Sequence, residues 1–389
     1  MKMEKSMKKL FVMGAYGCGN RGDDAILQSI CELFPDWEIW ASNGRYCDVS
    51  DFLPVKTVSC RLNEGFSASV LLSMIKDAFI IMGRIAKSDA LMFGGGSLIH
   101  DLTPYNLPFM YFWHIFAKIL HKKVFYFSIG IGPLNTNFGQ WISKKVLCSA
   151  DGLFVRDNRG LELCQQLGIQ NVELTSDAAF AVTKKNQCRK ETIKQLGLTE
   201  KEYFCVTASQ WFQSANFWKK DSMDFSKETE NFAKCIVAVA EQLKQPLVFV
   251  PTVMHDYSLG EELKRLMPEQ NFRITPGDLN CKAMAEIIEN SSFLLGVRMH
   301  SIICAARQGV PFLTLIYDEK VSQLLKRLDM EQYSLPLETV TPEAVRGCVD
   351  EVLNDQEEII TLLRARSAVL GKKVLRSRDI VLSLVSETV

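Results

Sequence analysis

The chain has 389 residues, with 45 lysines and arginines against 45 aspartates and glutamates, so its formal net charge is zero. This balance excludes a protein that binds nucleic acid through a strongly basic surface, because such binding needs surplus cations to displace counterions from phosphates. Hydrophobic residues make up 47% of the chain, which excludes global disorder and supplies a large core. At roughly 150 residues per domain, the length predicts two domains.

In the first half of the chain, short apolar runs alternate with longer amphipathic stretches. The runs predict strands and the stretches between them predict helices. Because the runs are continuously apolar, both faces of the sheet should be covered, which is typical of a parallel sheet built from βαβ units. The predicted strands are Lys9–Met13, Glu38–Ser42, Ala90–Phe93, Lys123–Ser128 and Gly152–Val155, and the predicted helices are Asp24–Leu33, Leu107–Leu120, Gly139–Ser149 and Arg159–Leu167.

A second series of the same kind follows the polar stretch Lys184–Glu202. We therefore place the domain boundary near residues 183–200 and predict an α/β protein of two Rossmann-like domains facing a cleft, residues 1–183 and 184–389. The tail Glu343–Val389 is predicted to form helices, which can also pack back on the first domain. The strands predicted here are Tyr203–Ala208, Pro246–Val250, Phe272–Ile274, Phe293–Val297 and Pro311–Ile316.

The twelve cysteines contain no CxxC pair, which favours free thiols in a reducing cytoplasm. Only three or four apolar residues precede the first glycines, which is typical of a first strand and not of a signal peptide. No stretch reaches 18 uninterrupted apolar residues, so we expect a cytoplasmic protein without a transmembrane helix. The five histidines include no HxH or HExxH pattern, so no metal site is expected.

Glycine-rich segments follow three of the predicted strands in the first domain. The first runs from Gly14 to Asp24 and offers Asn20 and Asp23 as polar groups, with a tight capped turn as the alternative. It contains the bare GxGxxG pattern, but no acidic residue ends the second strand to bind a ribose. The second segment comprises Gly94, Gly95, Gly96 and Ser97, and the third includes Gly132. Such segments lie where parallel sheets bind ligands.

Charged side chains also follow strand ends. Arg156 is either an anion ligand or a salt-bridge partner. In the second domain, Arg298, His300 and Lys320 follow two successive strands, and a helix begins at Ser301. This cluster predicts a site for a small dianion or trianion. His255, after another strand, either lines the same site or belongs to a turn capped by Asp256.

In series, these motifs resemble the polysaccharide pyruvyl transferases. The residues that carry the resemblance are Gly19-Asn20-x-Gly22-Asp23, Gly94-Gly95-Gly96-Ser97, Gly130-Ile131-Gly132-Pro133, Val155-Arg156-Asp157, Arg298-x-His300 and Tyr317-x-x-Lys320. They cover about residues 10–325 in the family's order, and the match looks closest to the members that act on secondary cell wall polymers. The resemblance implies a GT-B-like fold, with phosphoenolpyruvate as donor and a cell-surface sugar as acceptor.

In that branch the resemblance implies a 4,6-ketal on N-acetylmannosamine of a lipid-linked precursor, with phosphoenolpyruvate as co-substrate and no cofactor. We expect His300 to donate the proton, Arg298, Lys320 and Arg156 to neutralise the donor, and Tyr317 and His255 to line its site. Asn20, Asp23, Gly94–Ser97 and Gly132 would hold the acceptor. Aromatic residues and lysines in Leu107–Lys123 fit either a helix buried on the sheet or a contact with the inner face of the cell membrane.

Three other functions stay open at this point. A nucleotide-sugar glycosyltransferase of the same fold would need an acidic residue near Glu286 to hold a ribose. A non-catalytic sugar sensor would keep its biological activity without His300. A Rossmann oxidoreductase lacks its ribose-binding acid and ranks last.

Overall fold

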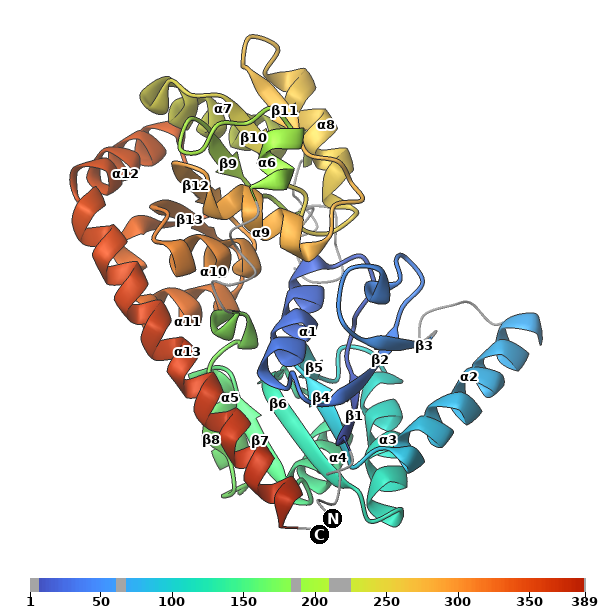
Figure 1. The fold of residues 1–389 in the computed structure, drawn as a ribbon. Coiled ribbons are helices and arrows are strands. Elements are labelled where there is room, and N and C mark those ends of the chain that lie inside the picture. Colours follow the sequence, from blue (N-terminus) through green and yellow to red (C-terminus); the bar gives the residue numbers. More distant parts are fainter. Residues whose placement is uncertain (1–6, 61–67, 183–189, 210–224, 388–389) are drawn as a thin grey trace, which may run out of the picture. The chain divides into compact units, whose positions relative to one another are not determined.

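The computed structural model describes residues 7–60, 68–182, 190–209 and 225–387. They form two compact units, each built around a parallel sheet (Figure 1). The first unit comprises Met1–Val182 and Leu370–Val389, and the second comprises Thr183–Val369. Two α/β domains with parallel sheets are therefore confirmed, and residues 370–389, which the sequence placed in the second domain with the option of packing on the first, belong to the first unit.

The sheet of the first unit has the strand order β3-β2-β1-β4-β6-β7-β8, and β5 pairs with β6. Every one of these pairs is parallel. Each of the five predicted runs contains a strand, and the sequence missed β3, β5 and β8, which have at most four residues. The strands are β1 Lys9–Met13, β2 Glu38–Asn43, β3 Lys56–Ser59, β4 Ala90–Gly94, β5 Ser97–Ile99, β6 Lys123–Ile131, β7 Gly152–Val155 and β8 Glu173–Leu174.

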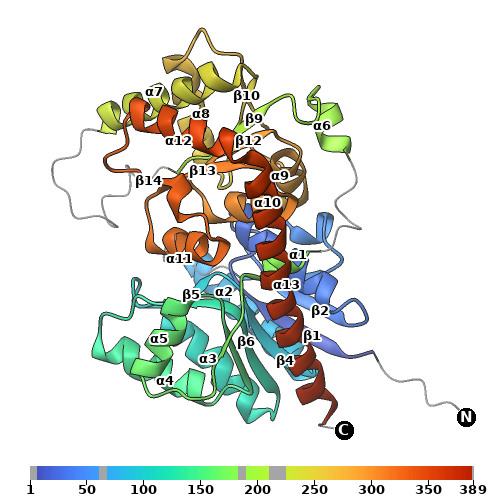
Figure 2. The ribbon, with the colours of Figure 1, turned by 90° about the vertical axis from the view of Figure 1, so that its left-hand side faces the viewer.

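Helices cover both faces of this sheet, which explains its continuously apolar strands. Successive residues of β1 enter opposite cores: Leu10 and Val12 pack with α1 and the end of α13, and Phe11 and Met13 pack with α2, α3 and α4. Figure 2 shows this sheet with α13 on one side and α3, α4 and α5 on the other. The helices are α1 Arg21–Leu33, α2 Ala68–Lys87, α3 Asn106–Ile119, α4 Asn137–Cys148, α5 Asn158–Gln166 and α13 Gln356–Ser386, with short 3-10 turns η1 Val49–Asp51 and η2 Ala178–Ala181.

The second unit repeats this plan with the strand order β11-β10-β9-β12-β13-β14, again wholly parallel. Its strands are β9 Phe204–Val206, β10 Leu247–Phe249, β11 Phe272–Ile274, β12 Phe293–Gly296, β13 Phe312–Ile316 and β14 Ser334–Pro336. Its helices are α6 Glu191–Gln195, α7 Phe225–Leu243, α8 Asp256–Leu266, α9 Cys281–Glu289, α10 Met299–Gln308, α11 Glu319–Leu328 and α12 Pro342–Asn354, and η5 covers Glu331–Tyr333.

The long helix α13 contributes to both units. Its first part packs in the second unit through the buried side chains of Ile359 and Leu363. Its last part joins the core of the first unit through Val374 and Val381, and the Ser377 hydroxyl donates a 2.9 Å hydrogen bond to the Thr175 hydroxyl. None of the described helices is long and apolar enough to cross a membrane.

Candidate functional site

In the first unit, the loop after β1 is tied to the start of α1. Asn20 is the N-cap of α1: its Oδ1 accepts from the Gly22 amide at 3.0 Å, and its Nδ2 donates to Asp23 Oδ2 at 2.7 Å. Further along, Asp24 Oδ1 accepts from the Gly17 amide at 2.8 Å. Asn20 and Asp23 are therefore mutual partners at one helix terminus, where amide groups and the helix dipole favour polar ligands.

The glycine turn after β4 lies against this helix terminus. Gly96 has a φ of +71°, and a Cβ there would lie 3.2 Å from Asp23 Oδ1. Gly95 has a φ of +63°, and a Cβ there would lie 2.2 Å from Ile26 Cγ2. The positive φ disfavours a side chain at both positions, and at Gly95 the close contact with Ile26 excludes one by space as well. The structure brings together Asn20, Asp23 and the Gly94–Ser97 turn, as an acceptor site would require.

Arg156, at the end of β7, is buried beside two carboxylates. Its Nη1 lies 3.3 Å from Asp177 Oδ2 and its Nε lies 3.5 Å from Asp157 Oδ2, while Nη2 donates to the Ser97 hydroxyl at 3.0 Å. Its guanidinium covers Gly130, where a Cβ would lie 3.0 Å from Nη2. Carboxylates therefore balance the charge of Arg156 at short range while one of its nitrogens holds the Ser97 hydroxyl, and a role of Arg156 in neutralising the donor stays a prediction.

Gly132 closes the same edge of the sheet. Its amide donates to the Ile99 carbonyl at 2.7 Å, which holds β5 against the end of β6, and its φ of +96° suits glycine. Gly132 therefore shapes this edge through its backbone.

In the second unit, Arg298 is the centre of a polar array at the carboxyl end of the sheet. Its Nη2 donates to Asp256 Oδ1 at 2.6 Å, its Nε donates to the Ala208 carbonyl at 3.3 Å, and its guanidinium also hydrogen-bonds the Tyr317 side chain. Burial alone would lower the pKa of Arg298, but Asp256 and Tyr317 outweigh it and raise that pKa, so the guanidinium stays charged. These groups follow four neighbouring strands: β10, β9, β12 and β13.

Asp256 belongs to this array, although the sequence predicted it only as a turn cap. Its side chain is fully buried, and its Oδ2 accepts from the Val253 amide at 3.0 Å and from the Thr252 hydroxyl at 3.2 Å. It therefore does close the turn, but its other oxygen orients Arg298. The position of Asp256 after a strand end was its only signal in the sequence.

The start of α10 is held by a pair of buried hydroxyls. Ser301 Oγ donates to the Arg298 carbonyl at 2.6 Å and lies 2.8 Å from Thr207 Oγ1, which accepts from the Val297 amide at 3.3 Å. In the described residues, no side chain caps this helix, because its N-cap is Arg298, which has no acceptor. The N-terminus of α10 thus combines a fixed position, a positive dipole end and a neighbouring guanidinium, which together suit an anion.

Three further predicted site residues lie near this array with different contacts and burial: His300, Lys320 and His255. His300 lies in the first turn of α10 and is half-buried. Lys320 Nζ lies 3.0 Å from Asp318 Oδ2 and 5.6 Å from the centre of the Tyr317 ring, so it reaches the array through Tyr317. His255 is exposed at the start of α8, next to Asp256. The structure therefore connects Arg298, Tyr317 and Lys320, places His300 two residues after Arg298 in the first turn of α10, and leaves His255 at the surface.

Two α/β domains with parallel sheets and polar groups at the carboxyl ends of their strands define a protein of the GT-B fold class. Within that class, the model of the polysaccharide pyruvyl transferase family matches residues 20–319, and the chain belongs to this family. It is accordingly a transferase that acts on polysaccharide.

Several known proteins are similar to this chain in sequence or in fold. The amylovoran biosynthesis protein AmsJ of Erwinia amylovora is 21% identical, over 94% of this chain and 98% of its own. Among solved structures, HepE of Anabaena in complex with UDP and glucose has a TM-score of 0.61 at 11% identity, covering 98% of this chain and 100% of its own. MnaA of S. aureus with UDP has a TM-score of 0.61 at 13% identity, covering 92% and 91%. At these identities the solved structures support the fold alone.

Proposed function

We propose that this enzyme transfers pyruvate from phosphoenolpyruvate to a sugar of a lipid-linked cell-wall precursor, forms a 4,6-ketal on N-acetylmannosamine and releases phosphate. The observation that carries the proposal is the Asp256–Arg298–Tyr317–Lys320 array beside the uncapped N-terminus of α10. Phosphoenolpyruvate has a phosphate and a carboxylate, and this array offers two cations and a helix dipole to such a ligand.

The chemistry needs a proton donor and two sugar hydroxyls. Protonation of the methylene carbon by His300 would make C2 of the donor electrophilic, and one hydroxyl would attack C2. The C2–O bond to phosphate then breaks, with Arg298 and Lys320 balancing the charge of the leaving group, and the second hydroxyl closes the ring at C2. The two sugar hydroxyls release two protons. One reprotonates His300, which gave its proton to the new methyl group, and the other leaves on the hydrogen phosphate.

The acceptor groups of this proposal belong to the first unit. Asn20, Asp23 and Ser97 offer hydrogen bonds, and the bare backbone of Gly95 and Gly96 allows close approach. Asp23 is the candidate base for a sugar hydroxyl, because it is only partly buried and its oxygen lies beside Gly96.

One feature weighs against the nucleotide-sugar alternative. Glu286, which would hold a ribose, already accepts from the Thr192 hydroxyl at 2.9 Å and from the Ile193 amide at 3.0 Å. Its carboxylate thus fastens α6 to α9, and both of its oxygens are engaged.

The test is to incubate the enzyme with phosphoenolpyruvate and an acceptor containing N-acetylmannosamine, and to measure phosphate release and the mass of the product. Lys320→Ala should weaken phosphoenolpyruvate binding about tenfold, since it removes a charge-assisted contact. His300→Ala should lower turnover on the order of 10²–10⁴-fold with a smaller effect on binding. Lys326→Ala, an exposed lysine on the same helix as Lys320, is the matched control and should change neither. Turnover of a nucleotide sugar without any use of phosphoenolpyruvate would overturn the proposal.

A further inference from the structure

Large apolar side chains are exposed on the helical layer that covers one face of the first unit's sheet. In this layer α3 contacts both α2 and α4. The exposed fraction reaches 69% for Phe79 and 68% for Ile119, and Phe138 and Trp141 stack with their ring centres 6.1 Å apart. We call this surface the α2–α4 outer face; its apolar members are Ile75, Phe79, Ile80, Phe112, Ile119, Phe138 and Trp141.

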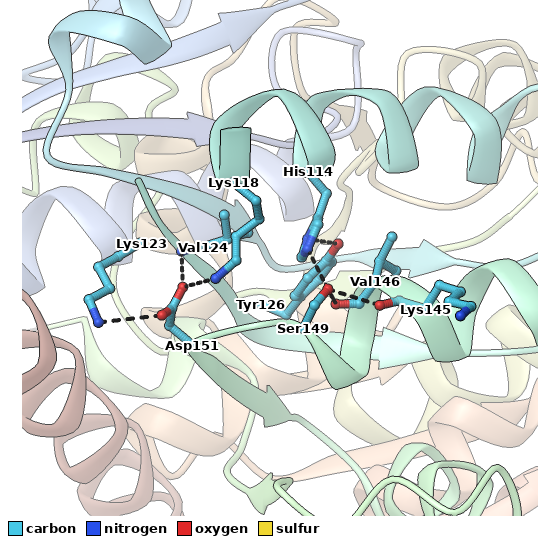
Figure 3. Close-up of polar contacts among 9 residues, drawn as sticks. All are labelled: His114, Lys118, Lys123, Val124, Tyr126, Lys145, Val146, Ser149 and Asp151. Carbon is cyan, nitrogen blue, oxygen red and sulfur yellow. Dashed lines mark hydrogen bonds and ion pairs between the residues drawn. The ribbon is translucent and has the colours of Figure 1, made fainter. Parts of the chain in front are cut away.

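Buried polar contacts determine which side of α3 belongs to this face (Figure 3). His114 is fully buried, with Nδ1 3.1 Å from the Tyr126 hydroxyl and Nε2 2.8 Å from the Ser149 hydroxyl. Ser149 donates to the Lys145 carbonyl at 2.9 Å, so its oxygen accepts from Nε2–H and Nδ1 accepts from Tyr126. With 3.6 residues per turn, Phe112 and Ile119 point away from His114. The outward direction of these two side chains is therefore built into the fold.

The same layer is strongly basic in a chain whose net charge is zero. Helices α2, α3 and α4 contain six lysines and arginines and one acidic residue, Asp77. Some of these cations have internal partners: Lys118 lies 2.8 Å from Asp151 Oδ2, and Arg84 stacks on Trp40 at 3.6 Å. Lys144 and Lys145 are exposed, and the described part of the chain shows no ion pair for either. The α2–α4 outer face thus joins exposed aromatic rings to uncompensated positive charge.

We propose that the α2–α4 outer face docks on the surface of an anionic phospholipid bilayer. Aromatic and aliphatic side chains enter the headgroup region of a bilayer while neighbouring lysines meet lipid phosphates. A protein partner fits less well, because protein–protein interfaces are depleted in lysine. The proposal goes beyond the proposed function, since it depends on neither the donor nor the acceptor of the reaction.

The test is co-sedimentation of the full chain with two kinds of vesicle. The neutral vesicles contain phosphatidylcholine alone, and the anionic vesicles contain phosphatidylcholine and phosphatidylglycerol in equal parts. We expect binding to the anionic vesicles that weakens with salt, and little binding to the neutral ones. The double variants Lys144→Glu/Lys145→Glu and Phe138→Ser/Trp141→Ser should each bind at least about tenfold more weakly. Thermal unfolding should stay close to wild type, because all four side chains are exposed.

Two matched controls lie in the second unit. Lys264→Glu/Arg265→Glu reverses an exposed pair of cations on α8, and Leu266→Ser/Val369→Ser removes exposed apolar side chains. Both should bind anionic vesicles like wild type. Equal losses in the controls, or no vesicle binding by the wild type, would overturn the proposal. So would a dimer in sedimentation equilibrium that Phe138→Ser/Trp141→Ser dissociates, without vesicle binding, since the face would then belong to a second copy of the chain.

Discussion

Replacing Asp256 with asparagine tests whether its carboxylate organises the candidate donor site. Asparagine keeps the shape of the side chain and one oxygen for the Val253 amide, but it removes the negative charge that faces Arg298 at 2.6 Å. The guanidinium then stays charged without its partner. We expect the variant to lose stability and to lose the fixed direction of Arg298.

The expected magnitude follows from the burial of the two side chains. Removing one partner of a buried ion pair costs about 3–5 kcal/mol. Asp256 is fully buried, but 23% of the Arg298 side chain is exposed, so water can solvate part of its charge. We therefore expect the lower limit, about 3 kcal/mol, which for a unit of this size lowers Tm by about 6–12 °C.

The assay is thermal unfolding at pH 8 with and without phosphoenolpyruvate. Phosphoenolpyruvate at 100 times its Kd should stabilise the wild type by about 2.7 kcal/mol and raise its Tm. This rise in Tm, the ligand shift, should be smaller in Asp256→Asn. The matched control is Glu289→Gln. Glu289, the last residue of α9, pairs with Arg307 in the last turn of α10 at 3.1 Å, away from the carboxyl ends of the strands. Burial raises the pKa of Glu289 to about 7, so its carboxylate is mostly ionised at pH 8. The control should lose stability but keep the ligand shift. Equal ligand shifts in both variants would refute the role of Asp256.

Two further predictions concern buried titratable groups of the first unit. Burial, assisted by Lys118, lowers the pKa of His114 from 6.5 to about 4, so its native imidazole stays neutral and stability should fall by up to about 3 kcal/mol as pH drops from 6.5 to 4. Chemical denaturation of His114→Gln should show a flatter pH dependence over this range, and an unchanged slope relative to wild type would contradict the assignment. Burial raises the pKa of Asp24 from 3.8 to about 7, so the stability it contributes below pH 3.8 is lost as pH rises through 7. Asp24→Asn should therefore be more stable than wild type at pH 8, by at most about 4 kcal/mol, and should lose that advantage near pH 4.

Hydrophobic patterning was sufficient to predict the long strands and the class of fold. The run Lys123–Ser128 is a clear case: it is apolar on both faces because β6 lies inside the sheet, and the structure extends it to Ile131. By contrast, β8 has two residues and β14 has three. Such short strands depend on backbone pairing with a longer neighbour, and periodicity carries little information over so few positions.

Side-chain partners that are distant in sequence explain what patterning missed at the site. Arg298 and Asp256 are 42 residues apart, and Arg156 and Ser97 are 59 apart. The sequence predicted polar groups at strand ends, but it could not show which cation already has a carboxylate. For Leu107–Lys123 it weighed burial against a membrane contact, and the structure shows a helix with a buried side that includes His114 and an exposed side that includes Phe112.

Although the net charge of the chain is zero, its cations are of two kinds: some are paired with a carboxylate at short range, and others are exposed without such a partner in the described residues. Arg298 and Lys320 each lie about 3 Å or less from an aspartate, so most of their charge is balanced at short range and their contribution to binding depends on geometry. Lys144 and Lys145 belong to α4, which has no acidic residue, so their charge acts over the Debye length and is screened by salt. Ionic strength should therefore separate the two interactions: raising it would release the chain from anionic vesicles well before it weakens a phosphate held beside Arg298.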